Sequence, residues 1–103
     1  MTSLEEAQRL SERVSQIYAR NCSIRRDDDW YILKLQEEVG ELVSVYLRQT
    51  GRGRVKGADS VAMQQQFNDE LADCMAQILL IAERFDVDLS EAMASKWFKY
   101  LDD

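Results

Sequence analysis

Histidine is absent from the 103 residues of the chain, and this absence removes several kinds of catalytic and metal chemistry. Ser-His-Asp and Cys-His catalysis are excluded, and so are metal sites with histidine ligands. The two cysteines, Cys22 and Cys74, form no Cys-x-x-Cys pair. A thiolate zinc site or a secreted disulfide framework is therefore not expected. The remaining ligand types favour a hard cation bound by oxygen atoms.

Proline is also absent, and the chain has no long apolar run. The lack of proline suits a chain made mostly of helix, because proline interrupts the helical hydrogen-bond ladder. The longest apolar run, residues 78–82, is far too short to span a bilayer. The N-terminal segment MTSLEEAQRL carries acidic residues early and lacks the apolar core of a signal peptide. We therefore expect a cytoplasmic protein without membrane contact.

Basic residues are too few to balance the acidic ones. The chain has 13 Lys and Arg against 19 Asp and Glu, which gives a net charge of −6. A surface this acidic disfavours the phosphate backbone of nucleic acids as a partner. It leaves open the binding of a phosphorylated small molecule through a metal ion. The length fits a single domain over residues 1–103, and 46% hydrophobic with 31% charged residues is typical of a folded globular protein.

Apolar residues recur at helical spacing along most of the chain, without strand-like alternation. The pattern predicts four helices, near residues 4–20, 30–49, 61–85 and 89–101. Their expected N-caps are Ser3, one of Asp27, Asp28 and Asp29, either Asp59 or Ser60, and Asp88. We therefore predict an all-α fold that resembles a four-helix bundle.

The first and last predicted helices each carry an apolar stripe. The first stripe, which includes Leu10, Val14 and Tyr18, is interpreted as a subunit interface, as packing against the chain's own core, or as both. The last stripe, which includes Met93 and Trp97, predicts that one face of that helix packs inward.

The segment 51–57, between the second and third predicted helices, holds three of the four glycines together with Arg52, Arg54 and Lys56. Its spacing matches neither the dinucleotide-binding nor the P-loop fingerprint. We interpret this segment as a flexible, solvated loop. The alternative is a lid that closes over phosphate groups.

The second predicted helix separates into two sides when it is plotted at about 100° per residue. The predicted core side consists of Tyr31, Ile32, Leu35, Val39, Leu42, Val43, Tyr46 and Leu47. The other side consists of Trp30, Lys34, Glu37, Glu38, Glu41 and Arg48. Like charges three or four residues apart repel by a few tenths of a kcal/mol. Taken alone, this acidic side is interpreted as a solvated face.

The third predicted helix changes that interpretation. Glu70 and Asp73 lie three residues apart at the front of a nearly all-apolar stretch, and Gln77 follows Asp73 by four residues. Carboxylates beside buried apolar residues are costly unless they are paired, protonated or bound to a cation. If the acidic residues of the two helices face each other, they form an oxygen-rich site for Mg²⁺ or Mn²⁺.

In this arrangement the chain resembles the MazG-like nucleoside triphosphate pyrophosphohydrolases. The resemblance lies in Glu37-Glu38-x-x-Glu41, then a loop, then Glu70-x-x-Asp73. It extends to Asp86-Val87-Asp88-Leu89 and to the following helix with Lys96, and covers roughly residues 28–100. The chain departs from the family at Ala94, where an asparagine is frequent, and at Tyr100 and Asp102-Asp103, where many members end in basic residues.

The resemblance implies an all-α homodimer or dimer of dimers that hydrolyses nucleoside triphosphates between the α- and β-phosphates. It implies that Glu38, Glu41, Glu70 and Asp73 hold Mg²⁺. Glu37 and Glu38 are then the expected catalytic residues, with Glu37 ordering or deprotonating the attacking water. The expected products are a nucleoside monophosphate and pyrophosphate.

Four further residues are candidates for substrate binding. Trp30 either stacks on the base or belongs to a core or interface. Lys34 either reaches a phosphate or forms an ion pair with Glu38. Lys96 matches a family lysine that approaches phosphates, and is otherwise a surface lysine. Gln77 completes the set.

Two other functions compete with this hypothesis. Phosphoribosyl-ATP pyrophosphohydrolase shares the acidic helix pattern, but the Ser/Thr-Tyr-Thr segment that usually precedes the acids there is missing here. A non-enzymatic helical interaction module, with its acids merely solvated, is the alternative from a different class.

Overall fold

The computed structural model describes residues 1–55 and 57–102, with the side chain of Asp102 left out of the description. The helices are α1 (Leu4–Asn21), α2 (Asp28–Gln49), α3 (Ser60–Arg84) and α4 (Leu89–Lys96), followed by the 3₁₀ helix η1 (Phe98–Asp102). No strand occurs in the described ranges, so the all-α prediction is confirmed. Lys56 of the predicted basic loop and Asp103 of the Asp102-Asp103 pair lie outside the described residues.

Each α-helix begins at one of the predicted capping residues. The accepting side chains are Ser3 for α1, Asp27 for α2, Asp59 for α3 and Asp88 for α4. Each accepts a hydrogen bond from the backbone N–H three residues on, at distances of 2.8–3.1 Å. These bonds satisfy backbone donors that the first helical turn leaves unpaired, and therefore fix where each helix starts.

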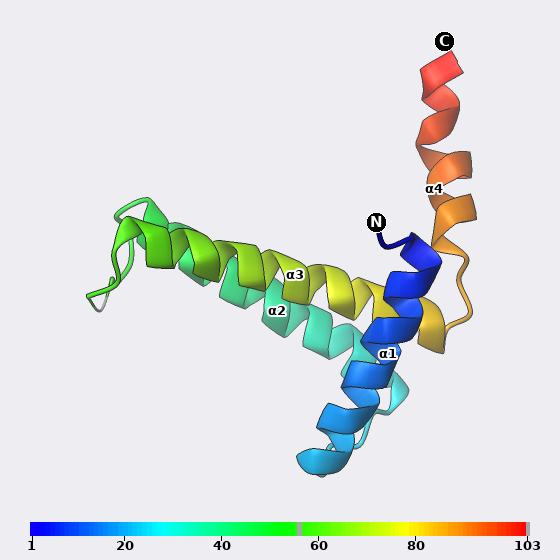
Figure 1. The fold of residues 1–103 in the computed structure, drawn as a ribbon, viewed down its shortest axis with the longest axis horizontal. Coiled ribbons are helices and arrows are strands. Elements are labelled where there is room, and N and C mark those ends of the chain that lie inside the picture. The colour runs from blue at the N-terminus through cyan, green and yellow to red at the C-terminus, as the bar shows by residue number, and fades with distance from the viewer. Residues whose placement is uncertain (56, 103) are drawn as a thin grey trace.

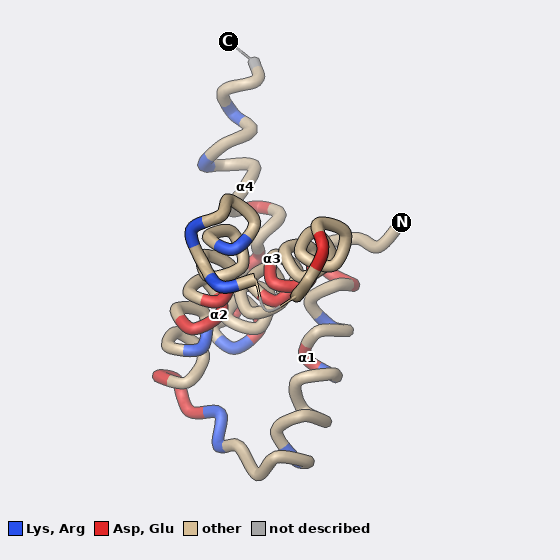
Figure 2. The backbone as a smooth tube through the Cα atoms, turned by 90° about the vertical axis from the view of Figure 1, so that its left-hand side faces the viewer, with Lys and Arg blue, Asp and Glu red and all other residues tan. Residues whose placement is uncertain are grey.

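The two longest helices, α2 and α3, form an antiparallel hairpin, and α1 crosses the end of this hairpin that lies away from the α2–α3 loop (Figure 1). Helix α3 contacts both α2 and α1, while α4 contacts α1 and leads away from the hairpin. Figure 2 looks along the hairpin from its loop end and shows acidic positions on both α2 and α3. No described helix is both long enough and apolar enough to cross a membrane.

The core is small, and it follows the line where the helices meet. Its buried apolar residues are Tyr31, Val45, Cys74, Leu79, Leu80 and Ala82. The predicted core side of α2 is only partly correct. Ile32, Val39, Val43 and Tyr46 were expected inside, yet 40–52% of their surface is exposed. Helix α2 packs along its length on α3, and one neighbouring helix covers a narrower arc than the apolar arc of α2.

The last helix also differs from the prediction. Helix α4 ends at Lys96, and the chain continues as the 3₁₀ helix η1 instead of one helix to residue 101. None of the α4 residues is buried, and Met93 and Trp97 expose 40% and 64% of their surface. The prediction that one face of this helix packs inward is therefore wrong for the single chain. Most helical stability comes from tertiary packing, and this segment has little of it.

Candidate metal centre between helices α2 and α3

Three carboxylates converge between α2 and α3. Glu38 and Glu41 come from α2, Glu70 comes from α3, and one oxygen atom of each lies within 4.8 Å of the others. The three-residue spacing brings the two α2 side chains to the same face of the helix. Glu38 is buried, Glu70 is half-buried and Glu41 is exposed. The cluster therefore has a buried base and one side open to solvent.

Two oxygen atoms at the buried base of this cluster lack partners. Glu38 Oε2 and Glu70 Oε2 are both buried, and neither has a hydrogen-bond partner among the described residues. An unsatisfied buried polar atom typically costs about 1–3 kcal/mol, and more when the group is charged. A proton or a bound cation at these two oxygen atoms would therefore remove an energetic cost that no described residue offsets.

The electrostatics of the cluster lead to the same conclusion. Burial raises the pKa of Glu38, and the charges of Glu41 and Asp73 raise it further, while Lys34 acts in the opposite direction. Burial likewise raises the pKa of Glu70, followed by the charges of Glu41, Asp73 and Glu38. The ionised form of these carboxyl groups is thus disfavoured by repulsion between their charges and by their loss of hydration.

The donor set fits a hard divalent cation. Carboxylate oxygen atoms are the preferred protein ligands of Mg²⁺, and Mg²⁺–oxygen distances are about 2.0–2.1 Å, so opposite ligands lie about 4 Å apart. The three oxygen atoms already lie within 4.8 Å of one another, on a similar scale. Glu38, Glu41 and Glu70 are therefore the residues that would hold the ion.

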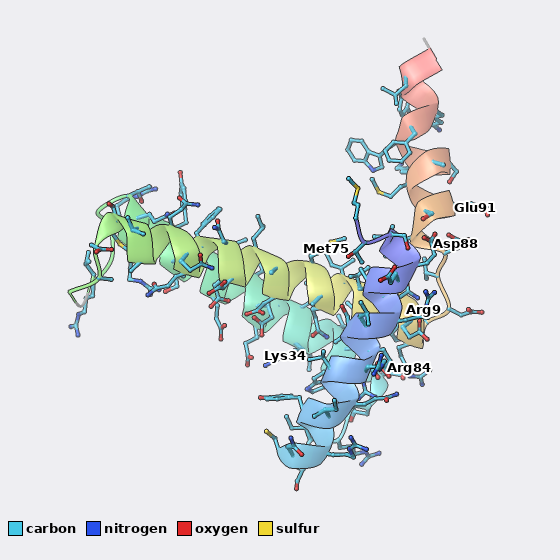
Figure 3. All side chains as sticks on the ribbon, in the orientation of Figure 1. Arg9, Lys34, Met75, Arg84, Asp88 and Glu91 are labelled. Carbon is cyan, nitrogen blue, oxygen red and sulfur yellow. The ribbon has the colours of Figure 1, made fainter. Side chains whose placement is uncertain are left out.

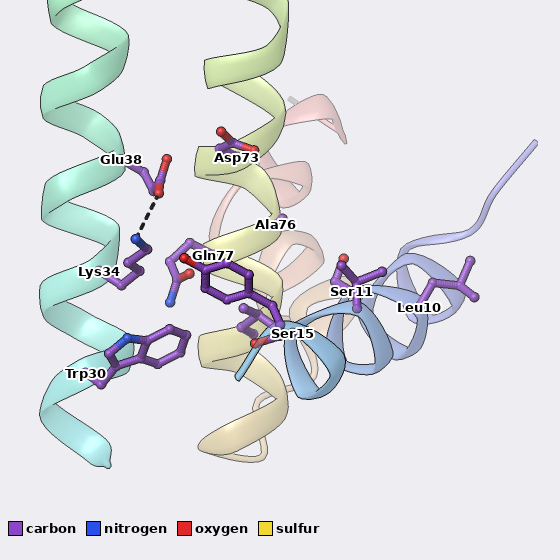
Figure 4. A pocket seen from close by; sticks show the side chains of 12 residues that line it. Leu10, Ser11, Ser15, Trp30, Lys34, Glu38, Asp73, Ala76 and Gln77 are labelled. Atoms are coloured by element: carbon purple, nitrogen blue, oxygen red, sulfur yellow. Dashed lines mark ion pairs between the residues drawn. The ribbon is translucent and has the colours of Figure 1, made fainter. Parts of the chain in front are cut away.

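Asp73, the fourth expected ligand, lies at the edge of the cluster. It is exposed on α3, one turn after Glu70, and is not one of the three converging carboxylates. Figure 4 shows Asp73 on α3 and Glu38 on α2 across the gap between the helices. The structure therefore brings three of the four predicted ligands together and leaves Asp73 beside them.

Lys34 occupies one side of the acidic cluster. Its Nζ lies 2.5 Å from Glu37 Oε1 and 3.6 Å from Glu38 Oε1, so the ion-pair alternative from the sequence is present. The hydrogen bond to Glu37 is the main cause that raises the pKa of Lys34. Lys34 thus lies near one oxygen atom of Glu38, while the other, Oε2, has no hydrogen-bond partner in the ranges that the structure describes. Glu37 itself is exposed and held by Lys34 outside the converging set.

A cavity of about 440 Å³ opens beside the cluster, within the range of small-molecule sites. Helix α1 supplies one wall, which includes Leu10, Ser11 and Val14 (Figure 4). Lys34, Glu38 and Asp73 line the side toward the acids. The α1 wall was not assigned to the site from the sequence. The helical spacing of apolar residues on α1 could have indicated this wall. The same spacing, however, is found in helices that face a core, a subunit interface or a pocket.

The remaining substrate-binding candidates lie in different places. Trp30 lines the cavity and packs edge-to-face against Tyr31, with ring centroids 5.0 Å apart. Gln77 also lines the cavity, but its Nε2 donates a buried hydrogen bond to the carbonyl oxygen of Tyr31 at 3.0 Å. Lys96 is exposed near the end of α4 and does not line this cavity.

Arg26 holds the α1 wall in position and was not singled out from the sequence. Its two terminal nitrogen atoms lie 2.7 and 3.1 Å from the two carboxylate oxygen atoms of Glu12 on α1. One of them also donates to Ser15 at 3.1 Å, and the guanidinium lies 5.6 Å from the centre of the Tyr31 ring. Arg26 therefore connects α1 to the start of α2, on either side of the cavity.

No protein-family model, no curated protein and no solved structure matches the chain. What the site can do is therefore inferred from its residues and geometry, together with the motif resemblance.

Proposed function

We propose that the protein is a Mg²⁺-dependent nucleotide pyrophosphohydrolase of the MazG-like type. It converts nucleoside triphosphates or deoxynucleoside triphosphates to the monophosphate and pyrophosphate, in the cytoplasmic nucleotide pool. One observation carries the proposal: a cluster of three carboxylates from two helices contains two buried oxygen atoms that have no hydrogen-bond partner within the described part of the chain. The neighbouring cavity offers room for a small substrate.

In this proposal Glu38, Glu41 and Glu70 would hold the cation. Asp73, exposed on α3 one turn after Glu70, would add negative charge beside them. Bound Mg²⁺ supplies neutralisation of phosphate charge and lowers the pKa of a bound water. Mn²⁺ has the same preference for oxygen ligands and is an expected substitute. Without a cation, an acidic cluster in a chain of net charge −6 would repel a polyanion.

The chain's own residues divide the remaining work. Lys34 adds a positive charge at the boundary between the cluster and the cavity. Glu37, held by Lys34, is the proposed residue that orders or deprotonates the attacking water. The ring of Trp30 and the apolar α1 wall provide surfaces for the base. Water adds to one of the two phosphorus atoms that share the α,β-bridging oxygen, and Glu37 takes up a proton of that water. The bond from this phosphorus atom to the bridging oxygen breaks, and the bridging oxygen leaves with the other product.

A product assay tests the proposal. We expect a panel of nucleoside and deoxynucleoside triphosphates with Mg²⁺ to yield monophosphate and pyrophosphate, and we expect EDTA to abolish turnover. Release of diphosphate and orthophosphate would refute the assigned bond. Absence of turnover with every nucleotide would favour the interaction module.

The proposed enzyme acts as a homo-oligomer, either a dimer or a dimer of dimers. The chain leaves a large apolar surface on the hairpin exposed.

A further inference from the structure

Lys34, Glu41 and Arg48 form a row along one side of α2. Successive members of the row are seven residues apart, so at about 100° per residue their side chains leave the helix within about 40° of one another. Lys34 lies at the end of the row near α1, where Figure 3 shows it at the edge of the hairpin. Arg48 lies at the end near the α2–α3 loop. The acidic cluster therefore has one basic residue on either side of it along the helix.

The side chain of Arg48 crosses from α2 to α3 about one helical turn away from the acidic cluster. Its Nη1 donates to Ser44 Oγ at 3.2 Å, and its Nη2 donates to Gln66 Oε1 at 3.3 Å. Ser44 follows Glu41 by three residues on α2. Gln66 precedes Glu70 by four residues on α3. Because the helices are antiparallel, both positions lie on the loop side of the cluster, about 5–6 Å from it along the helix axes. The guanidinium therefore borders the cluster at the end opposite the cavity.

Neutral groups hold the Arg48 guanidinium in place. Arg48 is half-buried, and it forms no ion pair with a carboxylate of the described residues. A Cβ atom at Gly53 would lie 3.1 Å from Arg48 Cγ, so the α2–α3 loop packs closely against the stem of the side chain. Ser44 and Gln66 each accept one hydrogen bond, and a guanidinium has further N–H donors to offer. Arg48 is thus a positioned positive charge that can bind an anion through two parallel hydrogen bonds.

We infer that Arg48 binds the phosphate groups farthest from the base, and that it thereby selects nucleoside triphosphates over shorter nucleotides. The inference rests on the proposed function. The cavity that includes Trp30 lies on one side of the cluster, and the Arg48 guanidinium lies on the other. A nucleotide with its base in the cavity reaches Arg48 only if its phosphate chain extends across the cluster. The α,β-bridging oxygen then lies over the carboxylates, and the pyrophosphate portion lies against Arg48.

Binding of pyrophosphate to the full chain in the presence of Mg²⁺ tests the inference without turnover. We expect calorimetric titration to show that Arg48→Gln weakens pyrophosphate binding by more than about tenfold, because hydrogen bonds to a charged group are lost. Binding of a nucleoside monophosphate should stay within about twofold of the wild type, because it ends before Arg48. Arg48→Lys keeps the charge without the planar pair of donors, and should restore only part of the affinity.

Arg52→Gln is the matched control for the loss of a positive charge. Arg52 is exposed in the α2–α3 loop, where its Nε donates to Thr50 Oγ1 at 3.1 Å. Its guanidinium lies 5.7 Å from the centre of the Tyr46 ring, on an arc of α2 that faces away from Glu41. Arg52→Gln should therefore bind pyrophosphate as tightly as the wild type.

Kinetics give a second test, in the ratio of kcat/KM for a nucleoside triphosphate to kcat/KM for the diphosphate of the same base. Arg48→Gln should lower this ratio by about tenfold, mainly by raising the KM for the triphosphate. A purely structural defect would lower both values together and leave the ratio unchanged. The inference is overturned by an unchanged ratio, by equal pyrophosphate affinities of wild type and Arg48→Gln, or by a wild type that binds no pyrophosphate. A wild type that hydrolyses no nucleotide refutes the proposed function, whereas pyrophosphate binding that depends on Arg48 would still support the phosphate site.

Discussion

At the scale of single residues, the site depends on a few carboxylate oxygen atoms. One carboxylate oxygen atom of Glu38 lies near Lys34, and the other has no hydrogen-bond partner among the described residues. One oxygen atom of Glu70, in the same cluster, also has none among them. A chain that uses its acids only for solubility has no reason to bury them. The unsatisfied pair is therefore what distinguishes a binding site from a solvated face.

Mg²⁺ should stabilise the wild-type protein, because a ligand that binds only the folded state shifts the unfolding equilibrium. At about ten times its dissociation constant the gain is about 1.4 kcal/mol, or a rise in Tm of about 5–10 °C for this size. Glu70→Gln removes a charge and a ligand, and should abolish most of this shift. Asp69→Asn, at the exposed neighbouring residue, should keep it. Equal shifts in both variants, measured by thermal unfolding with and without MgCl₂, would contradict the site.

The pH dependence of stability follows from the raised pKa values of Glu38 and Glu70. A carboxyl whose pKa is higher in the folded state binds its proton more tightly there, so ionisation favours unfolding. In EDTA, Tm should therefore rise as the pH is lowered from 7 toward 5. Glu70→Gln should show a weaker rise, because one titrating group is gone. A wild-type Tm that falls steadily over this window would contradict the burial of these carboxyls.

At the scale of elements, the cavity depends on how α1 is held across the hairpin. Helix α1 contributes the wall opposite Trp30 and Lys34, yet its link to the start of α2 comes from Arg26 in the connecting segment. The ion pair with Glu12 is mostly shielded, with 17% and 19% of the two side chains exposed. Pairing of this kind is bidentate and stronger than an exposed ion pair.

Arg26→Ala should lower the free energy of unfolding by about 1.5–3 kcal/mol, because it removes charged hydrogen bonds and leaves Glu12 partly buried. Arg25→Ala, at the exposed neighbouring residue, should change it by no more than about 0.5 kcal/mol. Urea unfolding measures both values. If the two variants lose the same stability, Arg26 does not hold the wall.

At the scale of the whole molecule, the extended α2–α3 hairpin encloses only a small core. None of the described side chains is completely buried, and exposed apolar residues occur on α1, on α2 and α3, and in the C-terminal segment. Burial of apolar area is the main favourable term in folding. A second copy would supply the missing layer, and would join folding to association.

Tm should therefore depend on protein concentration. If unfolding and dissociation occur together, a tenfold increase in concentration favours the assembled state by about 1.4 kcal/mol per mole of dimer. We expect calorimetry to show Tm rising by a few degrees for the wild type and staying constant for Val43→Glu. A wild-type Tm that is independent of concentration would mean that the chain is fully stable alone.

The sequence by itself determined the features that depend on neighbours along the chain. The helix starts at Ser3 and Asp88 follow from local hydrogen bonding, and the spacing of Glu38 and Glu41 places them on one helix face. The approach of Glu70 to these two residues was predicted only on the condition that the acidic sides of the two helices face each other, and the structure meets that condition.

Only the tertiary structure decided which sides of the helices are covered. Val39 and Val43 have the same apolar character as Val45, yet Val45 alone is buried, because α3 covers one arc of α2 and leaves the next arc open. The α1 wall of the cavity likewise depends on contacts distant in sequence. Periodicity records that a residue is apolar, whereas burial depends on which surface lies opposite it.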